Sequence, residues 1–463
     1  MSRALCWIRR DLRLSDHRAL FEACAFHDEV AVVFVFDSSI LGRIEDKSNR
    51  RVTFLMHSLQ EVDQGLRDRG SRLVIRFGDP VVEIPKLAHE LSATAVYSAR
   101  DYEPSAMARD HWVHEAFEGF RSVKDQVIFE PDEVLSQSNT SFRVFTPYSR
   151  RWLEKFDSRA DIVDYEPDLS KLIPAGQLDK YSLDLDFALI GFQEQTLTWR
   201  AGESAAKQAL DQFKSHIGNY GASRDIPSLD QTSHLSPHLR FGTISVREAV
   251  RTALKHQSEG ARKWLMELIW REFYQDVLFH NPQVVTTTFN PDYANLQWPG
   301  IDEHFEAWKA GQTGYPLVDA AMRAFNETGW MHNRLRMVVA SFLTKDLLVD
   351  YRKGEAHFAS LLLDFDLASN NGGWQWAASV GCDAQPYFRI FNPYLQSLKF
   401  DSEGKFIRQW VPELVDLDNK SIHCPSEMEA VMCGYPLPIV DHAEQRQKAI
   451  ALFSDAKRTA TSS

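Results

Sequence analysis

The sequence lacks the features that mark several large classes of protein. Its 463 residues include five cysteines, with no C-x-x-C pair and no histidine at the spacing of a zinc site. We therefore interpret the cysteines as reduced thiols and predict no metal site. The opening stretch MSRALCWIRRDLRL puts charge directly after a short apolar run, which is typical of neither a signal peptide nor a membrane span. A cytoplasmic protein is the prediction.

The phosphate-binding glycine motifs G-x-G-x-x-G and G-x-x-x-x-G-K-[ST] are also missing, so a nicotinamide or nucleoside triphosphate site would lack its usual cradle. The net charge of −12 argues by itself against nucleic acid as a partner. The segment from Ala321 to Lys353 runs against that trend, with six Lys or Arg and three acidic residues. A local basic patch of this kind could bind phosphates while the remaining surface stays acidic.

The first 134 residues alternate apolar strand-like runs with amphipathic helix-like runs. The strand-like runs are ALCWIRR, VAVVFVF, RLVIRF, ATAVYSA and QVIFEP. This alternation predicts a Rossmann-like parallel sheet with helices on both faces, in an α/β N-terminal domain. Sheets of this class bind ligands at the carboxyl ends of their strands.

The rhythm stops at about residue 135. Residues 135–197 contain Pro147, Pro167, Pro174 and polar clusters, and we expect a long interdomain linker on the surface. From residue 198 to 463 bulky side chains recur every three or four residues, as in GARKWLMELIWREFYQDVLFH, which predicts an all-α domain. Eight of the 12 Trp lie beyond Trp199, so this domain should be rich in packed indole rings.

Four stretches of the helical part carry residues suited to chemistry. In MELIWREF, Glu267 shares a helix face with Trp270 or Arg271, and this trio could read the edges of a planar heterocycle and stack on it. An ordinary amphipathic helix with a surface ion pair explains the same spacing. In TGWMHNRLRMVVASFL, Arg336 lies in an apolar context and needs an acidic partner, which Asp364 or Asp366 could supply. A core ion pair without a ligand remains the alternative.

The stretch DQTSHLSPHLRFGTIS places Thr232, Ser233 and Ser236 around the start of a helix with Pro237 in its first turn. Hydroxyls and free N–H groups at a helix start suit an anion such as a diphosphate, although N-capping alone accounts for one of them. In NNGGWQWAASVGCD, an Asn doublet and a Gly doublet precede Trp374 and Trp376. Redox chemistry or stacking on a base fits these indoles, and a structural turn packed by two Trp is the alternative.

Together these stretches resemble the photolyase/cryptochrome family, most closely its bacterial class I cyclobutane pyrimidine dimer DNA photolyases. The blocks that carry the resemblance span nearly the whole chain and are weakest at residues 135–195. They are WIRRDLRLSDHRAL, ELIWREFYQDVLFHNP, TGYPLVDAAMRAFNETGWMHNRLRMVVASFLTKDLL, NNGGWQWAASVGCDAQPYFRIFNP and FIRQWVPEL.

The resemblance implies that the helical domain holds FAD and that specific positions contact it. Implied FAD contacts are Tyr220, Thr232, Ser233, His234, Leu235, Ser236, Trp264, Arg271, Asn333, Arg336, Asp364, Asp366 and Asn370, the last beside the flavin N5. Implied substrate contacts are Glu267, Trp270, Arg334, Met337, Trp376 and Arg389. Trp374 resembles the electron donor next to the flavin, and Trp298 the outer member of a three-residue electron chain.

The implied activity is light-driven repair of cyclobutane pyrimidine dimers, by electron transfer from excited, reduced FAD (FADH⁻) to a lesion flipped out of the DNA. A cyclobutane ring offers neither a leaving group nor an acidic proton, so a change in electron count is needed to open it. A blue-light receptor of the cryptochrome type, without repair activity, is the alternative. Asn370 favours photolyase, Asn333 and Met337 stand where six-four photolyases have two catalytic His, and the chain ends about 50 residues after RQWVPEL. The implied partners are double- and single-stranded DNA, and a monomer is expected.

Two positions depart from the family pattern. The middle of the electron chain is Tyr351, and tyrosine is harder to oxidise unless it loses its proton at the same moment. We therefore expect photoreduction of oxidised flavin to be slow or to take another path. Phe365 stands between Asp364 and Asp366, where a small residue is common. A second, antenna chromophore is expected at the α/β domain, with Glu103 as a candidate contact and methenyltetrahydrofolate preferred over a deazaflavin.

Overall fold

The computed structural model describes residues 2–462, with side chains through Arg458. Its chain divides into two compact units. The first comprises Met1–Ser141, Thr146–Asn219 and Ser233–Phe279, and the second comprises Phe142–Phe145, Tyr220–Thr232 and His280–Ser463. The predicted boundaries at residues 134/135 and 197/198 stay a prediction about the family's domains.

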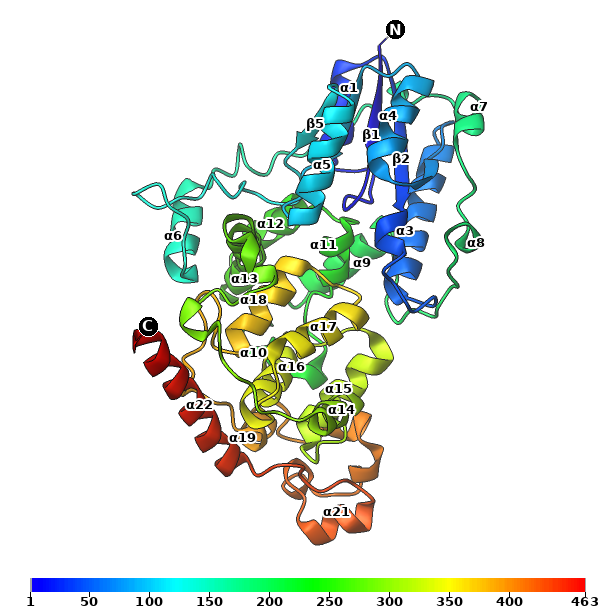
Figure 1. Cartoon of the computed structure of the whole chain (residues 1–463). Coiled ribbons are helices and arrows are strands. Elements are labelled where there is room, and N and C mark those ends of the chain that lie inside the picture. The colour runs from blue at the N-terminus through cyan, green and yellow to red at the C-terminus, as the bar shows by residue number, and fades with distance from the viewer. Residues whose placement is uncertain (1, 463) are drawn as a thin grey trace. The chain divides into compact units, whose positions relative to one another are not determined.

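A five-stranded, wholly parallel sheet forms the centre of the first unit (Figure 1). Its spatial order is β3-β2-β1-β4-β5. The strands are β1 (Arg3–Trp7), β2 (Glu29–Asp37), β3 (Val74–Gly78), β4 (Ala95–Ala99) and β5 (Phe120–Val123). All five precede residue 124, and the described part of the chain beyond it is helical or irregular, so the predicted fold class is confirmed.

Alternate residues of the central strands pack into two separate cores, one on each face of the sheet. Ala4 and Cys6 of β1 join one core with residues of α1 and α3, whereas Leu5 and Trp7 join the other with residues of α4 and α5. This is the period of two expected for a strand buried on both faces. The helices of the first unit are α1 (Arg18–Phe26), α2 (Ser38–Leu41), α3 (Arg50–Arg67), α4 (Pro80–Glu90), α5 (Pro104–Ala116), α6 (Phe145–Lys155), α7 (Ala175–Leu178), α8 (Phe187–Ile190), α9 (Glu203–Lys214), α11 (Ser236–Phe241), α12 (Val246–Lys255) and α13 (Glu259–His280).

The prediction of a fifth strand at residues 126–131 is wrong. Residues 126–131 (QVIFEP) are irregular, and β5 lies earlier, at Phe120–Val123. The backbone N–H groups of Ile128 and Phe129 donate to the carboxylate of Glu272 in α13, at 2.7 Å and 3.1 Å. Because these donors serve a carboxylate far along the chain, the apolar run is buried without joining the sheet.

Most of the segment that was expected to be a surface linker belongs to the first unit, and part of it is buried there. Ile173 donates its N–H to the Val30 carbonyl at 2.9 Å and is 1% exposed, and Leu183 donates to the Ile75 carbonyl. Trp152 of α6 is also buried. The short 3-10 helices of this unit are η1 (Leu169–Lys171), η2 (Asp179–Tyr181) and η3 (Ile217–Asn219).

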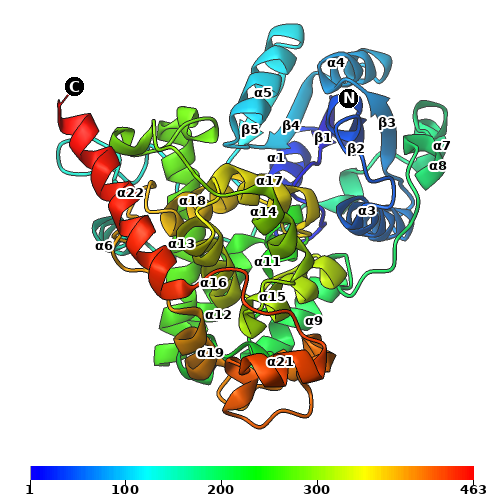
Figure 2. The ribbon, with the colours of Figure 1, turned by 60° about the horizontal axis from the view of Figure 1, so that its bottom comes forward.

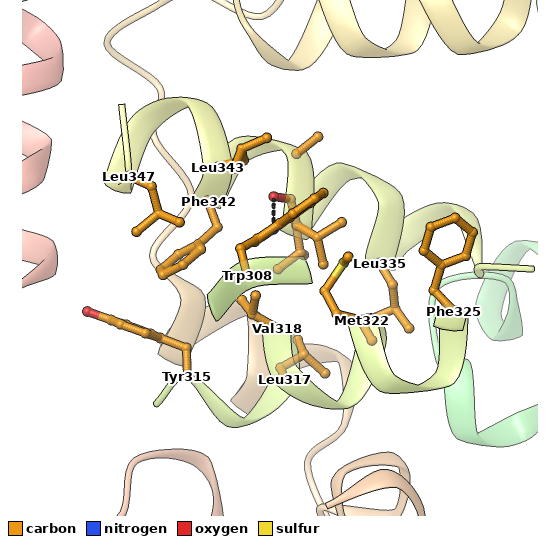
Figure 3. Packing of buried hydrophobic residues seen from close by; sticks show 14 of the residues in the cluster. Trp308, Tyr315, Leu317, Val318, Met322, Phe325, Leu335, Phe342, Leu343 and Leu347 are labelled. Carbon is orange, nitrogen blue, oxygen red and sulfur yellow. Dashed lines mark hydrogen bonds between the residues drawn. The ribbon is translucent and has the colours of Figure 1, made fainter. Parts of the chain in front are cut away.

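The second unit is built of helices around one large apolar core, part of which is shown in Figure 3. Figure 2 shows α22 as a single long helix along one side of this unit. Its helices are α10 (Tyr220–Ser223), α14 (Asp302–Ala310), α15 (Pro316–Thr328), α16 (Asn333–Ser341), α17 (Tyr351–Leu361), α18 (Leu367–Ala377), α19 (Pro393–Phe400), α20 (Lys405–Trp410), α21 (Glu427–Cys433) and α22 (His442–Ser462). Short 3-10 turns are η4 (Pro227–Leu229), η5 (Pro282–Val285), η6 (Pro291–Tyr293), η8 (Pro412–Leu414) and η9 (Ser421–His423), and η7 (Phe342–Asp346) is a π-helical turn. Across the described residues, no helix has the length and apolar character of a membrane span.

Candidate functional site

The Asn-Gly-Trp stretch forms the body of helix α18. Asp366 is its N-cap, and the Asp366 carboxylate accepts a hydrogen bond from the Ser369 N–H at 3.0 Å. A carboxylate at this position accepts from a backbone N–H group that has no partner within the helix. Its negative charge also interacts favourably with the positive N-terminal end of the helix dipole. The cap fixes where α18 begins, and it thereby places Asn370 and Asn371 in its first two turns.

The two Trp of α18 lie in different surroundings. Trp374 is 3% exposed, and its ring meets Phe358 edge-on at a centroid distance of 5.1 Å and Trp308 at 6.1 Å. Trp376 is only partly buried, at the margin of the same core. Trp374 therefore belongs to the packed interior, whereas Trp376 keeps part of its ring available.

Gly354 of α17 packs against the ring of Trp374, where there is no space for a side chain. A Cβ atom at Gly354 would lie 2.2 Å from Cη2 of Trp374, which is far inside van der Waals contact. We expect Gly354→Ala to lower the free energy of unfolding by about 1–3 kcal/mol, because the ring must move within a full core. The measurement is urea unfolding of the full chain.

Gly373→Ala is the matched control for that experiment. Gly373 is also a helical glycine, but a Cβ there would meet nothing within 4 Å. Alanine should raise stability there by about 0.5–1 kcal/mol through helix propensity alone. Equal effects of the two substitutions would contradict the packing argument.

The predicted pairing of Arg336 with Asp364 is present. The guanidinium of Arg336 donates to both carboxylate oxygens, at 2.8 Å and 3.1 Å, and its Nε donates to the Met331 carbonyl at 2.8 Å. The side chain of Asp364 is 3% exposed and that of Arg336 is 29% exposed. The guanidinium of Arg336 is thus partly exposed, whereas the carboxylate that balances its charge is buried. Such a pair can bind a ligand through the cation and also stabilise the core.

Arg334 has a partner that the sequence analysis did not identify. Its guanidinium donates to Asp225 at 2.9 Å and lies over the Phe400 ring, 4.3 Å from the centroid. Asn333 is exposed and Met337 is half-buried on the same helix, α16. A phosphate contact by Arg334 would therefore compete with Asp225.

The basic patch predicted between Ala321 and Lys353 is not a free cationic surface. Five of its six cations pair with carboxylates, and Lys345 is 1% exposed inside the core. The pairs are Arg323 with Glu413, Arg334 with Asp225, Arg336 with Asp364, Arg352 with Asp350, and Lys353 with Asp302. Counting charges along the chain missed these partners because most of them are distant in sequence.

Tyr351 and Trp298, the predicted middle and outer members of an electron chain, are neighbours. Their ring centroids are 6.4 Å apart; Tyr351 is 1% exposed and Trp298 is half-buried. Burial raises the pKa of Tyr351 to about 12, so its phenol holds its proton. The ring contacts found for Trp374 are instead to Phe358 and to Trp308, which lies in the core shown in Figure 3 and donates its Nε1–H to the Val339 carbonyl at 3.1 Å.

The predicted trio of α13 lies in the first unit. Glu267, Trp270 and Arg271 are all half-buried on one face of that helix, as their spacing requires. Trp264 is 3% exposed and packs against Phe213 at a centroid distance of 4.9 Å. Arg271 donates to the Gln126 carbonyl at 2.8 Å, so part of its guanidinium is used within the unit.

The next residue of α13, Glu272, was not singled out by the sequence analysis. Its carboxylate accepts from the N–H groups of Ile128 and Phe129 and from Nε1 of Trp152 at 2.6 Å. Burial raises the pKa of Glu272 to about 7, although these three donors lower it. No local pattern could have shown this role, because the donors come from residues more than 100 positions earlier.

The hydroxyl-rich segment before α11 contains an unsatisfied buried group. The N-cap of α11 is Leu235, so neither Thr232 nor Ser233 is its cap residue. The hydroxyl oxygen of Thr232 is buried and has no hydrogen-bond partner among the described residues. His234 has a positive φ of 53°, and its ring centroid lies 4.7 Å from that of Trp199 with the ring planes tilted by 37°. A buried hydroxyl of this kind calls for a polar ligand, and a diphosphate has suitable acceptor oxygens.

Three predicted residues remain. Tyr220 begins α10 and is 8% exposed, and Arg389 is exposed in the irregular segment before α19. Glu103, the candidate antenna contact, already accepts hydrogen bonds from Arg10 at 2.9 Å and Arg240 at 3.2 Å. The predicted residues from Ser233 to Ser236 and from Trp264 to Arg271 belong to the first unit, and all the others except Glu103 belong to the second.

Comparisons with known proteins match both parts of the chain. Residues 4–168 match the family model described as DNA photolyase, and residues 264–455 match the one described as the FAD binding domain of DNA photolyase. The chain is 38% identical to the deoxyribodipyrimidine photo-lyase of Escherichia coli, over 99% of this chain and 100% of the relative. It is also 38% identical to that of Halobacterium salinarum, over 98% and 99% of the two chains. The chain belongs to the photolyase/cryptochrome family.

Solved structures agree with this assignment. A bacterial class III photolyase from Agrobacterium tumefaciens superposes with a TM-score of 0.90 at 35% identity, covering 99% of this chain and 98% of that one. A cryptochrome from Synechocystis gives 0.86 at 27% identity, covering 98% and 99%. The predicted family and the predicted enzyme class, a deoxyribodipyrimidine photo-lyase, are confirmed, and the helical part is an FAD-binding domain.

The residues present fit a flavin dinucleotide. The buried Thr232 hydroxyl lacks a partner among the described residues, and the partly exposed guanidinium of Arg336 offers a cation. A buried hydroxyl without a partner and a partly exposed cation are features that suit a diphosphate.

Proposed function

We propose that this chain repairs cyclobutane pyrimidine dimers in DNA in a light-dependent reaction that uses FAD. The observation that carries the proposal is the full-length similarity to curated relatives, each named a deoxyribodipyrimidine photo-lyase. A protein has no side chain that opens a cyclobutane ring by acid or base catalysis, so the cofactor must supply light-driven electron transfer. The remaining tasks belong to the protein.

Those tasks are binding and orientation. Thr232 to Ser236 would hold the FAD diphosphate, Arg336 and Asp364 would fix the flavin, and Tyr220, Trp264, Arg271, Asn333 and Asp366 would complete the cofactor pocket. On the substrate side, the half-buried Glu267, Trp270 and Trp376 are suited to read and stack a flipped-out base, with Arg334, Met337 and Arg389 beside it. Single-stranded as well as double-stranded DNA should be bound, by a monomer.

The antenna chromophore and the location are also proposals. Methenyltetrahydrofolate is preferred over a deazaflavin. Glu103 is a poor candidate for direct contact unless it exchanges Arg10 or Arg240 for the chromophore. The cytoplasmic location stays a prediction.

The test is an absorption spectrum of the purified protein, followed by repair of a dimer-containing oligonucleotide under near-ultraviolet light with a dark control. Flavin bands and restoration of adjacent thymines only in the light are expected, and an additional band in the violet would identify the antenna. Bound flavin without repair would overturn the proposal in favour of a cryptochrome-type receptor.

One variant pair ties the cofactor to its proposed contacts. Asp364→Asn leaves Arg336 without its buried counter-charge, so we expect the FAD content after purification to fall at least tenfold. Asp302→Asn makes the same chemical change at an exposed carboxylate that pairs with Lys353, and it should leave the FAD content unchanged. Equal FAD content in the two variants would remove Asp364 from the cofactor site.

A further inference from the structure

One residue of α17, Glu355, contacts both members of the Asn370–Asn371 doublet. Its main-chain carbonyl accepts a hydrogen bond from Nδ2 of Asn370 at 3.1 Å. Its side-chain carboxylate accepts one from Nδ2 of Asn371 at 3.0 Å. Asn370 is 8% exposed and Asn371 is 3% exposed, so these bonds lie inside the protein, where each is hard to replace by water.

These contacts fix which way the Asn370 amide points. A carbonyl oxygen can only accept, so the group that faces the Glu355 carbonyl must be the NH₂ of Asn370. The amide oxygen of Asn370 consequently lies on the side away from that carbonyl. Asn370 can offer only a hydrogen-bond acceptor in that direction.

The neighbouring amide is fixed by more bonds. Nδ2 of Asn371 also donates to the Val284 carbonyl at 3.0 Å, and its Oδ1 accepts from Gln375 Nε2 at 3.3 Å. Gln375 in turn donates to the Val284 and Thr287 carbonyls and accepts from the Phe289 N–H at 2.8 Å. The Glu355 carboxylate is the charged acceptor of this otherwise neutral set, and charge-assisted hydrogen bonds are the stronger ones.

We propose that Glu355 is a positioning residue for the flavin site, which holds the Asn doublet so that Asn370 presents its amide oxygen to the flavin, and that ionisation of the Glu355 carboxyl strengthens this hold. The inference rests on the proposed function, which puts Asn370 beside flavin N5. An acceptor at that position favours the reduced cofactor, which carries a proton on N5 as a donor, over the oxidised one, which does not.

The carboxyl of Glu355 is placed to change charge near neutral pH. Burial raises the pKa of Glu355 to about 7, while the Asn371 hydrogen bond and Arg352 lower it and Asp350 raises it. Arg352 and Asp350 stand at the start of α17, and the packed elements α18 and η5 contribute the Asn amides and the Val284 carbonyl. Above this pKa the carboxylate accepts strongly from Asn371, and below it the bond weakens.

The first measurement is the ratio of reduced to oxidised FAD in the holoprotein, in a viologen redox buffer at pH 6 and pH 8. Glu355→Gln keeps both acceptors but removes the ionisable group, whereas Glu355→Ala removes the side-chain acceptor. We expect the ratio in Glu355→Ala to be at least tenfold below that in Glu355→Gln. At each pH, the quotient is the reduced-to-oxidised FAD ratio of the wild type divided by that of Glu355→Gln. This quotient should be at least threefold higher at pH 8 than at pH 6. Equal ratios in the two variants, or a quotient that does not rise, would overturn the proposal.

The second measurement needs no bound flavin. In protein with ¹⁵N-labelled asparagine, the side-chain amide signals of Asn371 should titrate with a midpoint near pH 7 in the wild type and stay constant in Glu355→Gln. Glu306→Gln, at an exposed glutamate of α14, is the matched control and should leave the titration unchanged. If the Asn371 amide signals of the wild type do not change with pH, the Glu355 carboxyl does not control the position of the Asn370–Asn371 doublet. Titration together with absence of repair would instead count against the proposed function alone.

Discussion

Replacing Asp125 by Asn is expected to lower the free energy of unfolding of the first unit by about 3–5 kcal/mol. The carboxylate of Asp125 binds two buried cations, Arg13 at 2.6 Å and Arg247 at 2.8 Å. All three side chains are at most 4% exposed. Asparagine keeps the shape but removes the charge, so two desolvated guanidinium groups lose their shared counter-ion.

The same network extends to a second carboxylate. Asp16 accepts from Arg247 at 2.8 Å and from Arg251 at 2.7 Å, which joins the turn after β1 to α12. Urea unfolding gives the loss of stability, and hydrogen exchange at α12 locates it. Asp211→Asn, at an exposed i,i+3 pair with Lys214 on α9, should cost less than about 0.5 kcal/mol. Equal losses in the two variants would show that the buried network does not stabilise the unit.

The effect of Asp125 should depend on pH in a defined direction. Burial by itself raises the pKa of Asp125, but Arg13 and Arg247 hold it far below its usual range. A carboxyl with a depressed folded-state pKa stabilises the protein above its unfolded pKa, about 4, and this contribution is lost as pH falls through the folded value. The difference between wild type and Asp125→Asn should thus be constant from pH 6 to pH 8 and shrink below pH 4.

Replacing Tyr351 by Trp is expected to speed photoreduction of bound, oxidised FAD at least tenfold. Tyr351 must lose its proton when it is oxidised, yet burial raises its pKa to about 12 and its ring is 1% exposed. An indole can be oxidised without losing a proton at the same moment, so Trp removes this requirement. The rate of flavin reduction under blue light with an external electron donor measures the effect.

Two further variants complete this experiment. Tyr351→Phe should not exceed the wild-type rate, and repair by flavin that is already reduced should be the same in every Tyr351 variant. Trp308→Phe tests the other indole beside Trp374, whose centroid lies 6.1 Å away. Wild-type photoreduction rates in both Tyr351 variants would refute a role for Tyr351. Unfolding curves control for the larger Trp ring, which costs about 1–3 kcal/mol where a site is already full.

The fold could be predicted where hydrophobic pattern and chain order agree. Four of the five strands overlap predicted runs, because a strand buried on both faces is largely apolar. QVIFEP failed because its burial comes from Glu272 and Trp152, whose positions the local sequence does not contain. An apolar run shows that a segment is buried, and only its hydrogen-bond partners decide whether it joins a sheet.

In the candidate site, too, local spacing predicted some features and partners distant in sequence decided the others. Spacing along a helix was enough to put Glu267, Trp270 and Arg271 on one face of α13. The need of a partly buried cation for a counter-ion suggested Asp364 or Asp366 for Arg336, and the structure has Asp364. The partner of Arg334, Asp225, lies 109 residues away and was missed. Glu355 and Gln375 were missed for a related reason, because an amide or a carboxyl is informative only once its acceptors and donors are known.

The sequence by itself determined the class of fold, the family and the residue types available for a flavin site. These follow from periodicity and from ordered motifs, which are properties of the chain read in order. Only the tertiary structure decided that the basic run from Ala321 to Lys353 is neutralised, that Thr232 keeps an unsatisfied hydroxyl, and that the Asn370 amide is oriented by Glu355. Charge pairing, burial and hydrogen-bond direction depend on distances between residues far apart in the chain, and folding alone sets those distances.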